Sequence, residues 1–402
     1  MQQRKFAGSF TQQEPIPEYA IAAAVAVMRS GRLHRYNVAP GEIAEAAALE
    51  REYAGWQGAR YCLATTSGGA ALQIALRAVG VAAGEPVLTN AFTLAPVPGA
   101  IHAVGAIPVL VEITEDLVID LDDLAHKAER SGARVLMLSL MRGHMPDMDR
   151  VMQVAAAHGL TVIEDCAHTM GARWRGRLSG SFGAAGCFST QSYKHMNSGE
   201  GGFLVSEDAA IMARAIVMSG SYMLYGRHGA APGPEAFADI RYQVPNLSAR
   251  LDNLRAAILR PQLARLDDNI ARWTRRHNAV EAVLRACPAI RLPARAEGAF
   301  RVGSSIQFFL PGVGAADARR FLDATAARGV ELKWFGAPEP VGYTSSHHSW
   351  RYVPAQDLPR TDAILAELFD MRIPLTFSVA DCRLIGEIIA EEAEALIKAA
   401  AQ

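Results

Sequence analysis

Apolar runs that alternate with helical segments constrain the fold of this chain more than any other feature of its sequence. Between residues 67 and 265, runs such as Arg134–Leu140 and Leu160–Asp165 are separated by segments with helical spacing, such as Met148–His158. Strands that are apolar throughout and are joined by helices form a parallel sheet that is buried on both faces. The sequence therefore predicts an α/β fold whose large domain has a mainly parallel central sheet flanked by helices.

The last third of the chain predicts a second, smaller domain. The elements expected there are a long helix with a kink at Pro261, two strands and a final helix, at residues 253–286, 304–310, 331–335 and 381–398. We expect an N-terminal arm and a large domain over residues 1–265, and a small α+β C-terminal domain over residues 266–402.

The composition narrows the class of protein. The 40 Lys and Arg residues nearly balance the 41 Asp and Glu residues, which gives no support for a nucleic-acid or membrane partner. The 5 cysteines are scattered without a Cys-x-x-Cys pair, which favours a reducing compartment over a zinc ribbon. The apolar run Ala20–Met28 is too short to span a bilayer and follows a polar, proline-containing stretch unlike a signal peptide. We therefore expect a cytoplasmic protein.

Two segments have the composition of ligand-binding turns. Ser67-Gly68-Gly69 precedes an expected helix. The two glycines allow the backbone to approach a phosphate closely, and the start of the helix offers it free N–H groups. Such a glycine pair is nevertheless more often a plain turn. Asp165 and His168 follow an apolar strand, and ligands bind at the carboxyl ends of parallel strands. A buried Asp can keep the pyridine nitrogen of pyridoxal phosphate (PLP) protonated, but it can also cap a helix. His168 alone is more often a structural residue.

Lys194 is the candidate nucleophile. It lies in the small and polar segment Phe188–Gly202, and a Lys amine can form an imine with the aldehyde of PLP. Ser189, five residues earlier, can donate to a phosphate, and the glycines after Lys194 allow a tight turn beside a ring. A lone Lys after a strand is nearly always a surface residue. The glycine turn, Asp165 and Lys194 nevertheless occur together and in the order that a PLP site requires. This joint occurrence favours a PLP site over a plain turn, a helix cap and a surface lysine that are unrelated to one another.

These motifs resemble those of the DegT–StrS family of PLP-dependent aminotransferases, fold-type I enzymes that act mostly on keto-sugars and keto-cyclitols. The resemblance runs from Ser30 to the Ile373-Pro-Leu segment and is most specific at Glu-Asp-Cys-Ala-His and at Lys194 with its following glycines. It implies that Lys194 is the Schiff-base lysine and general acid/base, that Asp165 partners the ring nitrogen, and that His168 lies beside the ring. The cofactor-binding residues that it implies are Lys194, Asp165, His168, Ser67, Gly68, Gly69, Ser189, Gln191, Asn246 and Ser248.

The resemblance also implies a homodimer with shared active sites, because the segment around Asn246 matches a loop that reaches the cofactor phosphate of the neighbouring subunit. Three positions depart from the family pattern. Gly69 stands where the family usually has Thr, and Leu94 stands where an aromatic residue often covers the ring. The loop reads Ser248-Ala-Arg250-Leu instead of Asn-Tyr-Arg-Met, so either Asn246 or Ser248 could serve there.

The function expected from the resemblance is a two-stage transamination from glutamate or glutamine to a ketone, in aminosugar or aminocyclitol biosynthesis. The acceptor stays open between a free keto-cyclitol, a nucleotide-linked keto-sugar and a ketone that is not a sugar. The alternatives are a PLP dehydratase or lyase, in which relatives carry His in place of the lysine, and a non-catalytic metabolite-binding regulator. Arg142, Arg250 and Lys333 are candidates to hold the donor carboxylate. No metal site is expected, because His347-His348 has no convincing ligand partner nearby in the sequence.

Overall fold

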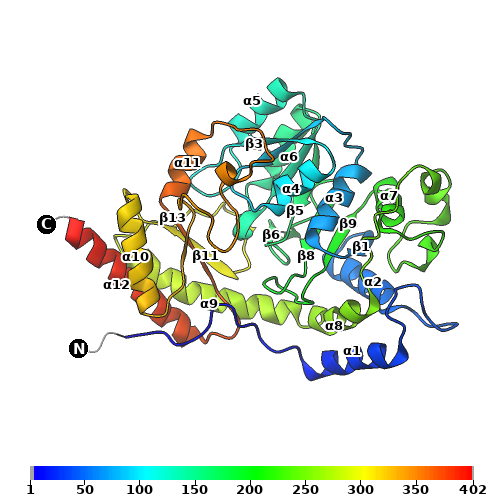
Figure 1. Cartoon of the computed structure of the whole chain (residues 1–402), viewed down its shortest axis with the longest axis horizontal. Helices are drawn as coiled ribbons and strands as arrows, with labels where there is room; N and C mark the ends of the chain where they lie inside the picture. Colours follow the sequence, from blue (N-terminus) through cyan, green and yellow to red (C-terminus); the bar gives the residue numbers. More distant parts are fainter. Residues whose placement is uncertain (1–3, 401–402) are drawn as a thin grey trace.

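A seven-stranded sheet forms the centre of the larger part of the molecule (Figure 1). In the computed structural model, which describes residues 4–400, the strands are ordered β3-β2-β4-β5-β8-β9-β1. Pairs from β3 to β8 are parallel, and β9 runs antiparallel to both of its neighbours. The strands are β1 (Tyr61–Thr65), β2 (Pro86–Asn90), β3 (Ile107–Val111), β4 (Val135–Ser139), β5 (Thr161–Asp165), β8 (Ala185–Ser189) and β9 (Gly202–Ser206). The predicted mainly parallel sheet is confirmed.

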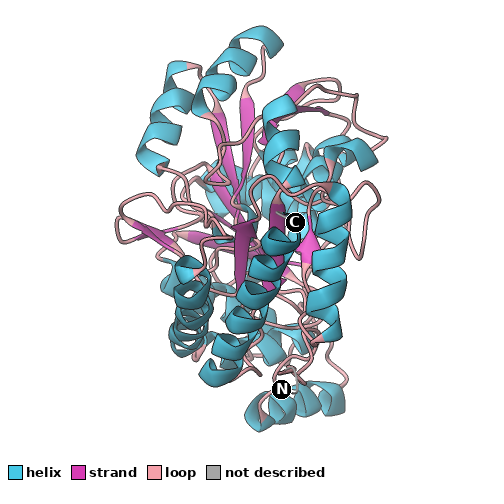
Figure 2. Ribbon diagram, turned by 90° about the vertical axis from the view of Figure 1, so that its left-hand side faces the viewer, coloured by secondary structure: helices cyan, strands magenta, loops and turns pink. Residues whose placement is uncertain are grey.

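Helices cover both faces of this sheet, as the side view in Figure 2 shows. One face packs against α3 (Gly68–Ala78), α4 (Pro96–Ala103) and α7 (Ala209–Ser219). The other packs against α2 (Glu45–Gln57), α5 (Leu121–Ser131), α6 (Met148–Ala157) and α8 (Asn253–Leu263). Within β4, Val135 and Met137 belong to the first core and Leu136 and Leu138 to the second. Successive side chains of a strand point to opposite faces of the sheet, so an apolar strand contributes side chains to the hydrophobic core on each face.

The C-terminal part of the chain forms a smaller antiparallel sheet flanked by helices. Strands β11 (Ser305–Phe309), β13 (Leu368–Arg372) and β12 (Lys333–Trp334) pair in that order. The helices here are α9 (Leu266–Ala286), α10 (Ala315–Ala327), α11 (Pro359–Ala366) and α12 (Val379–Ala400). A third, short sheet pairs β6 (Arg173–Trp174) with β7 (Arg177–Leu178) and β10 (Ala299–Phe300). Single 3₁₀ turns lie at Met141–Gly143, Tyr225–Arg227, Pro234–Phe237, Ile240–Tyr242 and His347–Ser349.

The N-terminal arm runs along the small domain before it enters α1 (Glu18–Ser30) near the large domain (Figure 1). Phe6 and Phe10 pack edge-on against Phe377, with ring centroids 4.8 and 4.9 Å from it. Arg4 pairs with carboxylates of α12. The boundary at residues 265 and 266 stays a prediction, and the arm contributes to the small-domain core although it precedes the large domain in sequence.

The long helix expected over residues 253–286 is wrong, because the chain forms two helices there. Pro261 lies inside α8, where it lacks an N–H donor, and α8 ends two residues later at Leu263. α9 then begins at Leu266. At the break, the side chain of Gln262 donates to the carbonyl of Asn197 at 2.7 Å and accepts from the N–H of Asn197 at 2.9 Å. The end of α8 therefore holds the loop that carries Lys194.

A buried ion pair holds the segment after α1 against β1. Arg35 donates to both carboxylate oxygens of Glu50, at 2.8 Å each, and Glu50 also accepts from the N–H of Ala64 at 3.0 Å. Burial alone would raise the pKa of Glu50, but the nearby charges of Arg35 and His228 hold it well below its usual value. The bonds to Glu50 position the strand that leads directly into Ser67.

Within residues 4–400, no helix is long and apolar enough to cross a membrane.

Candidate active site

Asp165 ends β5 at the edge of the sheet where the parallel strands finish. Its carboxylate accepts from the hydroxyl of Ser139, at the end of β4, at 3.0 Å and from the N–H of Ala167 at 3.1 Å. Burial raises the pKa of Asp165, and these two hydrogen bonds oppose that effect. No helix begins at this point of the described chain, since the next element after β5 is β6, so the helix-cap alternative for Asp165 is wrong. Among residues 4–400, no cation is hydrogen-bonded to the buried Asp165 carboxylate.

Lys194 and His168 meet beside this carboxylate. Lys194 lies in the loop between β8 and β9, and its Nζ is 2.7 Å from His168 Nε2. Burial and then the charge of Arg142 lower the pKa of Lys194 to about 7, against the opposing effect of Asp165. Burial and then the charge of Lys194 lower the pKa of His168 well below its usual value. A neutral imidazole therefore accepts a hydrogen bond from an amine that loses its proton near neutral pH.

The first turn of α3 packs directly on the end of β8. A Cβ added at Gly68 would lie 2.9 Å from Ser189 Cβ, and one added at Gly202 would lie 2.7 Å from the nitrogen of Gly68. Only glycine fits this approach. The side chain of Ser67 accepts from the N–H of Ala70 at 3.0 Å, while the N–H groups that open the helix have no acceptor within it. These N–H groups and the Ser189 hydroxyl lie close together, and we call this arrangement, which suits an anion, the α3 cradle.

The neighbouring position is less constrained. A Cβ added at Gly69 would meet only Ser67 Oγ, at 3.8 Å, which is an ordinary contact distance. A larger side chain therefore has room at Gly69. Neither the space around residue 69 nor its backbone conformation therefore requires glycine in place of the family's usual Thr.

Gln191 shapes the loop that presents Lys194. Its side-chain oxygen accepts from the N–H of Tyr193 at 3.0 Å, and its main-chain carbonyl accepts from the N–H of Lys194 at 2.8 Å. The backbone N–H of Gln191 in turn donates to Ser189 Oγ at 3.3 Å. Within one chain, Gln191 thus links the end of β8 to the lysine.

Asn246 and Ser248 do not join this cluster within one chain. Both are exposed, and Asn246 Oδ1 accepts from the N–H of Ser248 at 2.9 Å. Their segment runs beside the end of β1, where the N–H of Thr66 donates to the carbonyl of Ala249. The two side chains therefore lie on the surface near the strand that precedes the α3 cradle.

The three cations considered for a substrate carboxylate all have partners. Arg142 donates to Asp370 at 2.6 Å and also to the hydroxyl of Tyr343. Arg250 donates to the carbonyl of Gly220 at 2.9 Å. The ammonium of Lys333 donates to the carbonyl oxygens of residues 341 and 343, at 3.1 and 3.0 Å.

Sequence reasoning missed Arg372, which lies near Lys194 in the folded chain. It belongs to β13, and its guanidinium carbon lies 3.9 Å from the ring centroid of Tyr193. The signal for it was present in the sequence, because Asp370 and Arg372 are two charged residues in the otherwise apolar run 368–373. Two charged side chains at alternate positions of an otherwise apolar strand point to the same face, and charged groups in such a strand indicate a partner or a ligand there.

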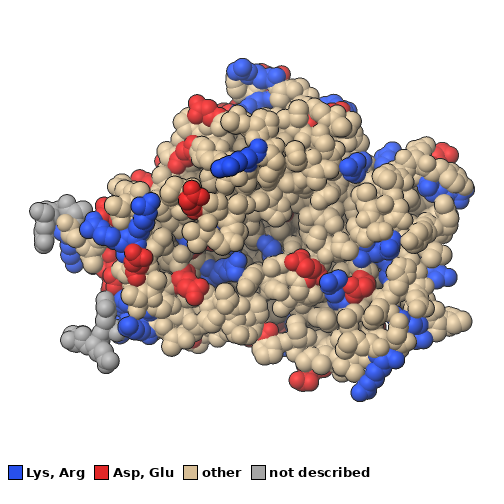
Figure 3. All heavy atoms as spheres, in the orientation of Figure 1, with Lys and Arg blue, Asp and Glu red and all other residues tan. Residues whose placement is uncertain are grey.

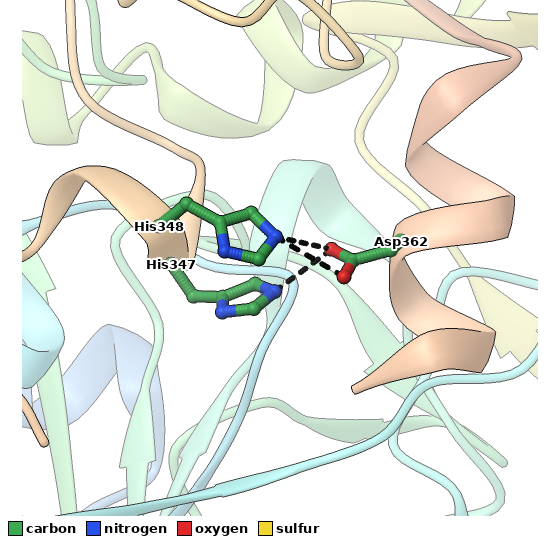
Figure 4. A group of neighbouring side chains, drawn as sticks. All are labelled: His347, His348 and Asp362. Carbon is green, nitrogen blue, oxygen red and sulfur yellow. Dashed lines mark hydrogen bonds and ion pairs between the residues drawn. The ribbon is translucent and has the colours of Figure 1, made fainter. Parts of the chain in front are cut away.

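His347 and His348 both contact Asp362, as Figure 4 shows. The three side chains offer ligand atoms that all lie within 4.8 Å of one another, so the expectation that this pair has no convincing partner is wrong. The carboxylate comes from α11, which the sequence separates from the histidines by more than ten residues. The Asp362 carboxylate is 2.8 Å from His347 Nε2 and 3.1 Å from His348 Nε2, and it thereby ties the loop after Tyr343 to α11.

Comparison with known proteins places this arrangement in a family. The sequence profile of the DegT/DnrJ/EryC1/StrS aminotransferase family matches residues 17–389. The L-glutamine:scyllo-inosose aminotransferase of Streptomyces griseus is 35% identical over 226 residues, which are 56% of this chain and 52% of the relative. The 3-amino-5-hydroxybenzoate synthase of Amycolatopsis mediterranei is 34% identical over 237 residues, 57% of this chain and 58% of the relative. The matches thus span only about half the length of these curated relatives.

Solved structures extend the likeness to the whole fold. The crystal structure of 3-amino-5-hydroxybenzoic acid synthase superposes with a TM-score of 0.81 at 26% identity, covering 96% of this chain and 99% of the other. The predicted fold class, a fold-type I large domain with a smaller C-terminal domain, is therefore confirmed. The family profile covers nearly the whole chain, and both the sequence relatives and the fold agree with it. The chain belongs to the DegT/DnrJ/EryC1/StrS aminotransferase family.

Proposed function

We propose that this chain is a PLP-dependent aminotransferase that moves an amino group from an amino-acid donor to a ketone acceptor. The observation that carries the proposal is the position of Lys194. Its amine lies 2.7 Å from His168 Nε2, has a pKa lowered to about 7, and shares the carboxyl edge of the sheet with the buried Asp165. A half-buried lysine of lowered pKa beside a buried carboxylate is typical of a catalytic site.

The residues present fit the cofactor. Asp165 is a buried carboxylate that has no hydrogen-bonded cation, and a protonated ring nitrogen would supply one. The start of α3 at Gly68 lies directly against Ser189, an approach that a Cβ at Gly68 would prevent, and this brings helix N–H groups and a hydroxyl together for a phosphate. When bound, PLP supplies an aldehyde that bonds to amines and a ring that withdraws electrons from the carbon of the donor amine.

Lys194 does the proton transfers in this proposal. With a pKa of about 7, roughly half of the amine is unprotonated at pH 7, whereas an ordinary lysine is almost fully charged. The neutral Nζ can attack an aldehyde, and once displaced by the donor it can take the proton from the donor's α-carbon. In the second stage it returns a proton to the carbon of the acceptor. The neutral Nε2 of His168 holds the amine in place between these steps.

Asp165 would balance the positive charge of the ring nitrogen when PLP is bound. Its two oxygens are already oriented by Ser139 and Ala167, so the carboxylate is held in one direction before any ligand arrives. The hydroxyl of Thr93 donates to Ser139 Oγ at 2.7 Å and so fixes the direction in which Ser139 donates. Such pre-organisation avoids a cost of reorientation during the reaction.

The substrates proposed are L-glutamine as donor and a keto-cyclitol or keto-sugar as acceptor. The names of the relatives support them, since several are L-glutamine:scyllo-inosose or 2-deoxy-scyllo-inosose aminotransferases. A ring ketone that carries a carboxylate is a second candidate acceptor. It is favoured by the unpaired Arg372 beside the site and by relatives named for 3-amino-5-hydroxybenzoate, an amine on a ring with a carboxylate.

We further propose a homodimer in which Asn246 or Ser248 reaches the cofactor phosphate of the neighbouring subunit. Their exposure and their place beside the strand that enters the α3 cradle support this role. Within residues 4–400 of one chain, neither side chain hydrogen-bonds to Lys194, which supports a role at the phosphate of a second copy.

The test of the function is the donor half-reaction. Holoenzyme given L-glutamine alone should lose the visible absorbance of lysine-bound PLP as the pyridoxamine form appears, and a ketone should restore it. Lys194→Ala should abolish both changes. A dehydratase or lyase would not convert the cofactor with an amino donor alone, and a regulator would show no spectral change across a panel of donors. Persistence of turnover in Lys194→Ala would refute the proposed mechanism.

A further inference from the structure

A cavity of about 410 Å³ opens between the small domain and the loop that carries Lys194. Its walls come from β12, β13 and the segment around Tyr343, and Tyr193 lines it from the lysine loop. The face drawn in Figure 3 is hollowed near its centre, and Lys or Arg atoms lie within the hollow. The charged residues that line the cavity are Arg142, Lys333, Arg372, Glu331 and Asp370.

Most of these charges are already satisfied inside the protein. Asp370 accepts from Arg142 at 2.6 Å on one oxygen and from the side chain of Gln307 at 2.7 Å on the other. Lys333 is held by two carbonyl oxygens. Glu331 is exposed, and within residues 4–400 it forms no ion pair with the cations of the cavity. The balance of charge in the cavity is therefore positive, and Asp370 has little capacity left to neutralise a further cation.

Among the cations of this cavity, Arg372 has no hydrogen-bond or ion-pair partner in the part of the chain that the structure describes. Its side chain makes no hydrogen bond or ion pair with any residue in the described range 4–400, although it is half-buried. The guanidinium lies over the ring of Tyr193, which immediately precedes Lys194. Stacking on an aromatic face orients the plane of an arginine but leaves its edge N–H groups available. Those N–H groups form a planar fork that matches a carboxylate.

Arg372 is also close enough to the proposed catalytic groups to act on them electrostatically. Its positive charge lowers the pKa of Lys194 and of His168, after the larger effect of burial. A second polar contact also joins the lysine loop to the small domain. His195, next to Lys194, has its Nε2 3.0 Å from the Oγ of Ser304, which directly precedes β11, the strand paired with β13. A group bound at Arg372 would thus lie on the small-domain side of the lysine.

We propose that Arg372 binds a carboxylate of the substrate while the substrate's amino or keto carbon is held at Lys194. The inference rests on the proposed function and deepens it by naming the chemical class of the substrate. The carboxylate belongs either to the amino-acid donor or to the ring ketone that accepts the amine. Arg142, Lys333 and Arg250 are excluded as the main carboxylate ligand because each already has partners in the protein.

The donor arm of the test compares L-glutamine with L-glutaminol, in which an alcohol replaces the carboxylate. Arg372→Gln should slow the reaction of holoenzyme with L-glutamine by about 10- to 100-fold, the range that corresponds to loss of one charged hydrogen-bonded pair. The reaction with L-glutaminol should change little. Arg372→Lys should recover part of the loss, since the charge returns without the planar fork.

The acceptor arm uses the pyridoxamine form with 3-oxocyclohexane-1-carboxylate and with cyclohexanone, two ketones that differ by the carboxylate alone. A loss in Arg372→Gln that is confined to the carboxylated ketone assigns the site to the acceptor, and a loss confined to L-glutamine assigns it to the donor. The exposed Arg319 on α10 provides the matched control. Arg319→Gln removes the same charge and should change none of these rates.

A binding measurement separates this inference from the proposed function. Calorimetry with glutarate, which has carboxylates but no amine or ketone to react, should give an affinity for holoenzyme that falls by about 10-fold or more in Arg372→Gln. If the wild type converts no donor yet shows this fall, the aminotransferase proposal fails and the carboxylate site stands. Equal glutarate affinities together with unchanged ratios of glutamine to glutaminol rates would overturn the inference.

Discussion

Gly68 and Gly69 allow a sharp test of the α3 cradle, because they are adjacent glycines of one helical turn with different surroundings. In Gly68→Ala the new methyl would lie 2.9 Å from Ser189 Cβ, well inside the ordinary contact distance. The end of β8 must then move away from α3. In Gly69→Ala the nearest atom would be 3.8 Å away, so nothing needs to move.

The two substitutions should therefore change stability in opposite directions. Overpacking of this kind costs about 1–3 kcal/mol, and at Gly68 it outweighs the gain of about 0.5–1 kcal/mol that Ala brings to a helix over Gly. Gly69→Ala keeps that gain, so its free energy of unfolding should rise slightly. Because the helix gain is common to both variants, the expected difference between them is the overpacking cost of about 1–3 kcal/mol, which urea unfolding of the cofactor-free chain can measure.

The same pair tests the cradle as a phosphate site. Widening the gap between Gly68 and Ser189 moves two donors apart, so Gly68→Ala should weaken PLP binding by about tenfold or more. Gly69→Ala should leave the affinity unchanged, and Gly69→Thr should strengthen it by adding a hydroxyl donor. Fluorescence titration of the cofactor-free chain with PLP provides the measurement. Equal stabilities and equal affinities for the two alanine variants would refute the assignment of the cradle.

Two further predictions concern the charged groups. The rate at which Lys194 of the cofactor-free chain bonds to PLP should rise with pH through about 7 and then level off, because only the unprotonated amine attacks. The rate at pH 6 should be roughly a tenth of that at pH 8, and a rise that continues toward pH 10 would show an ordinary lysine. Glu50→Gln leaves Arg35 buried without its carboxylate and should lower the free energy of unfolding by about 3–5 kcal/mol. Glu52→Gln at the half-exposed pair with Arg260 should cost less than about 1 kcal/mol, and similar losses in urea unfolding would contradict the role of burial.

Local sequence determined the elements that carry the proposed chemistry. The apolar runs of β4 and β5 predict strands buried on both faces, and the Ser67-Gly68-Gly69 turn predicts a helix directly after it, although α3 already begins at Gly68. The order of the glycine turn, Asp165 and Lys194 then led to the prediction of one site. These inferences succeed because strand burial, helix starts and glycine turns depend on residues that are close together in the sequence.

Other features depend on contacts between distant segments and could not be read locally. The long helix expected over residues 253–286 breaks after Pro261, where Gln262 bonds to the loop before Gly199. His347 and His348 acquire Asp362 from another helix. The spacing of residues along the sequence does not predict which distant side chains will contact one another in the folded chain.

The sequence by itself determined that this chain has a parallel α/β core, a lysine with a glycine-rich surround and a carboxylate at a strand end. Only the tertiary structure decided how the charges are shared. Arg142, a candidate named from the sequence, is neutralised by Asp370 from 228 positions away, whereas Arg372 lies over Tyr193 without an ion-pair partner among residues 4–400. Charge pairing is a property of three-dimensional neighbours, because the energy of two charges depends on their separation in space and on burial, not on their separation along the chain.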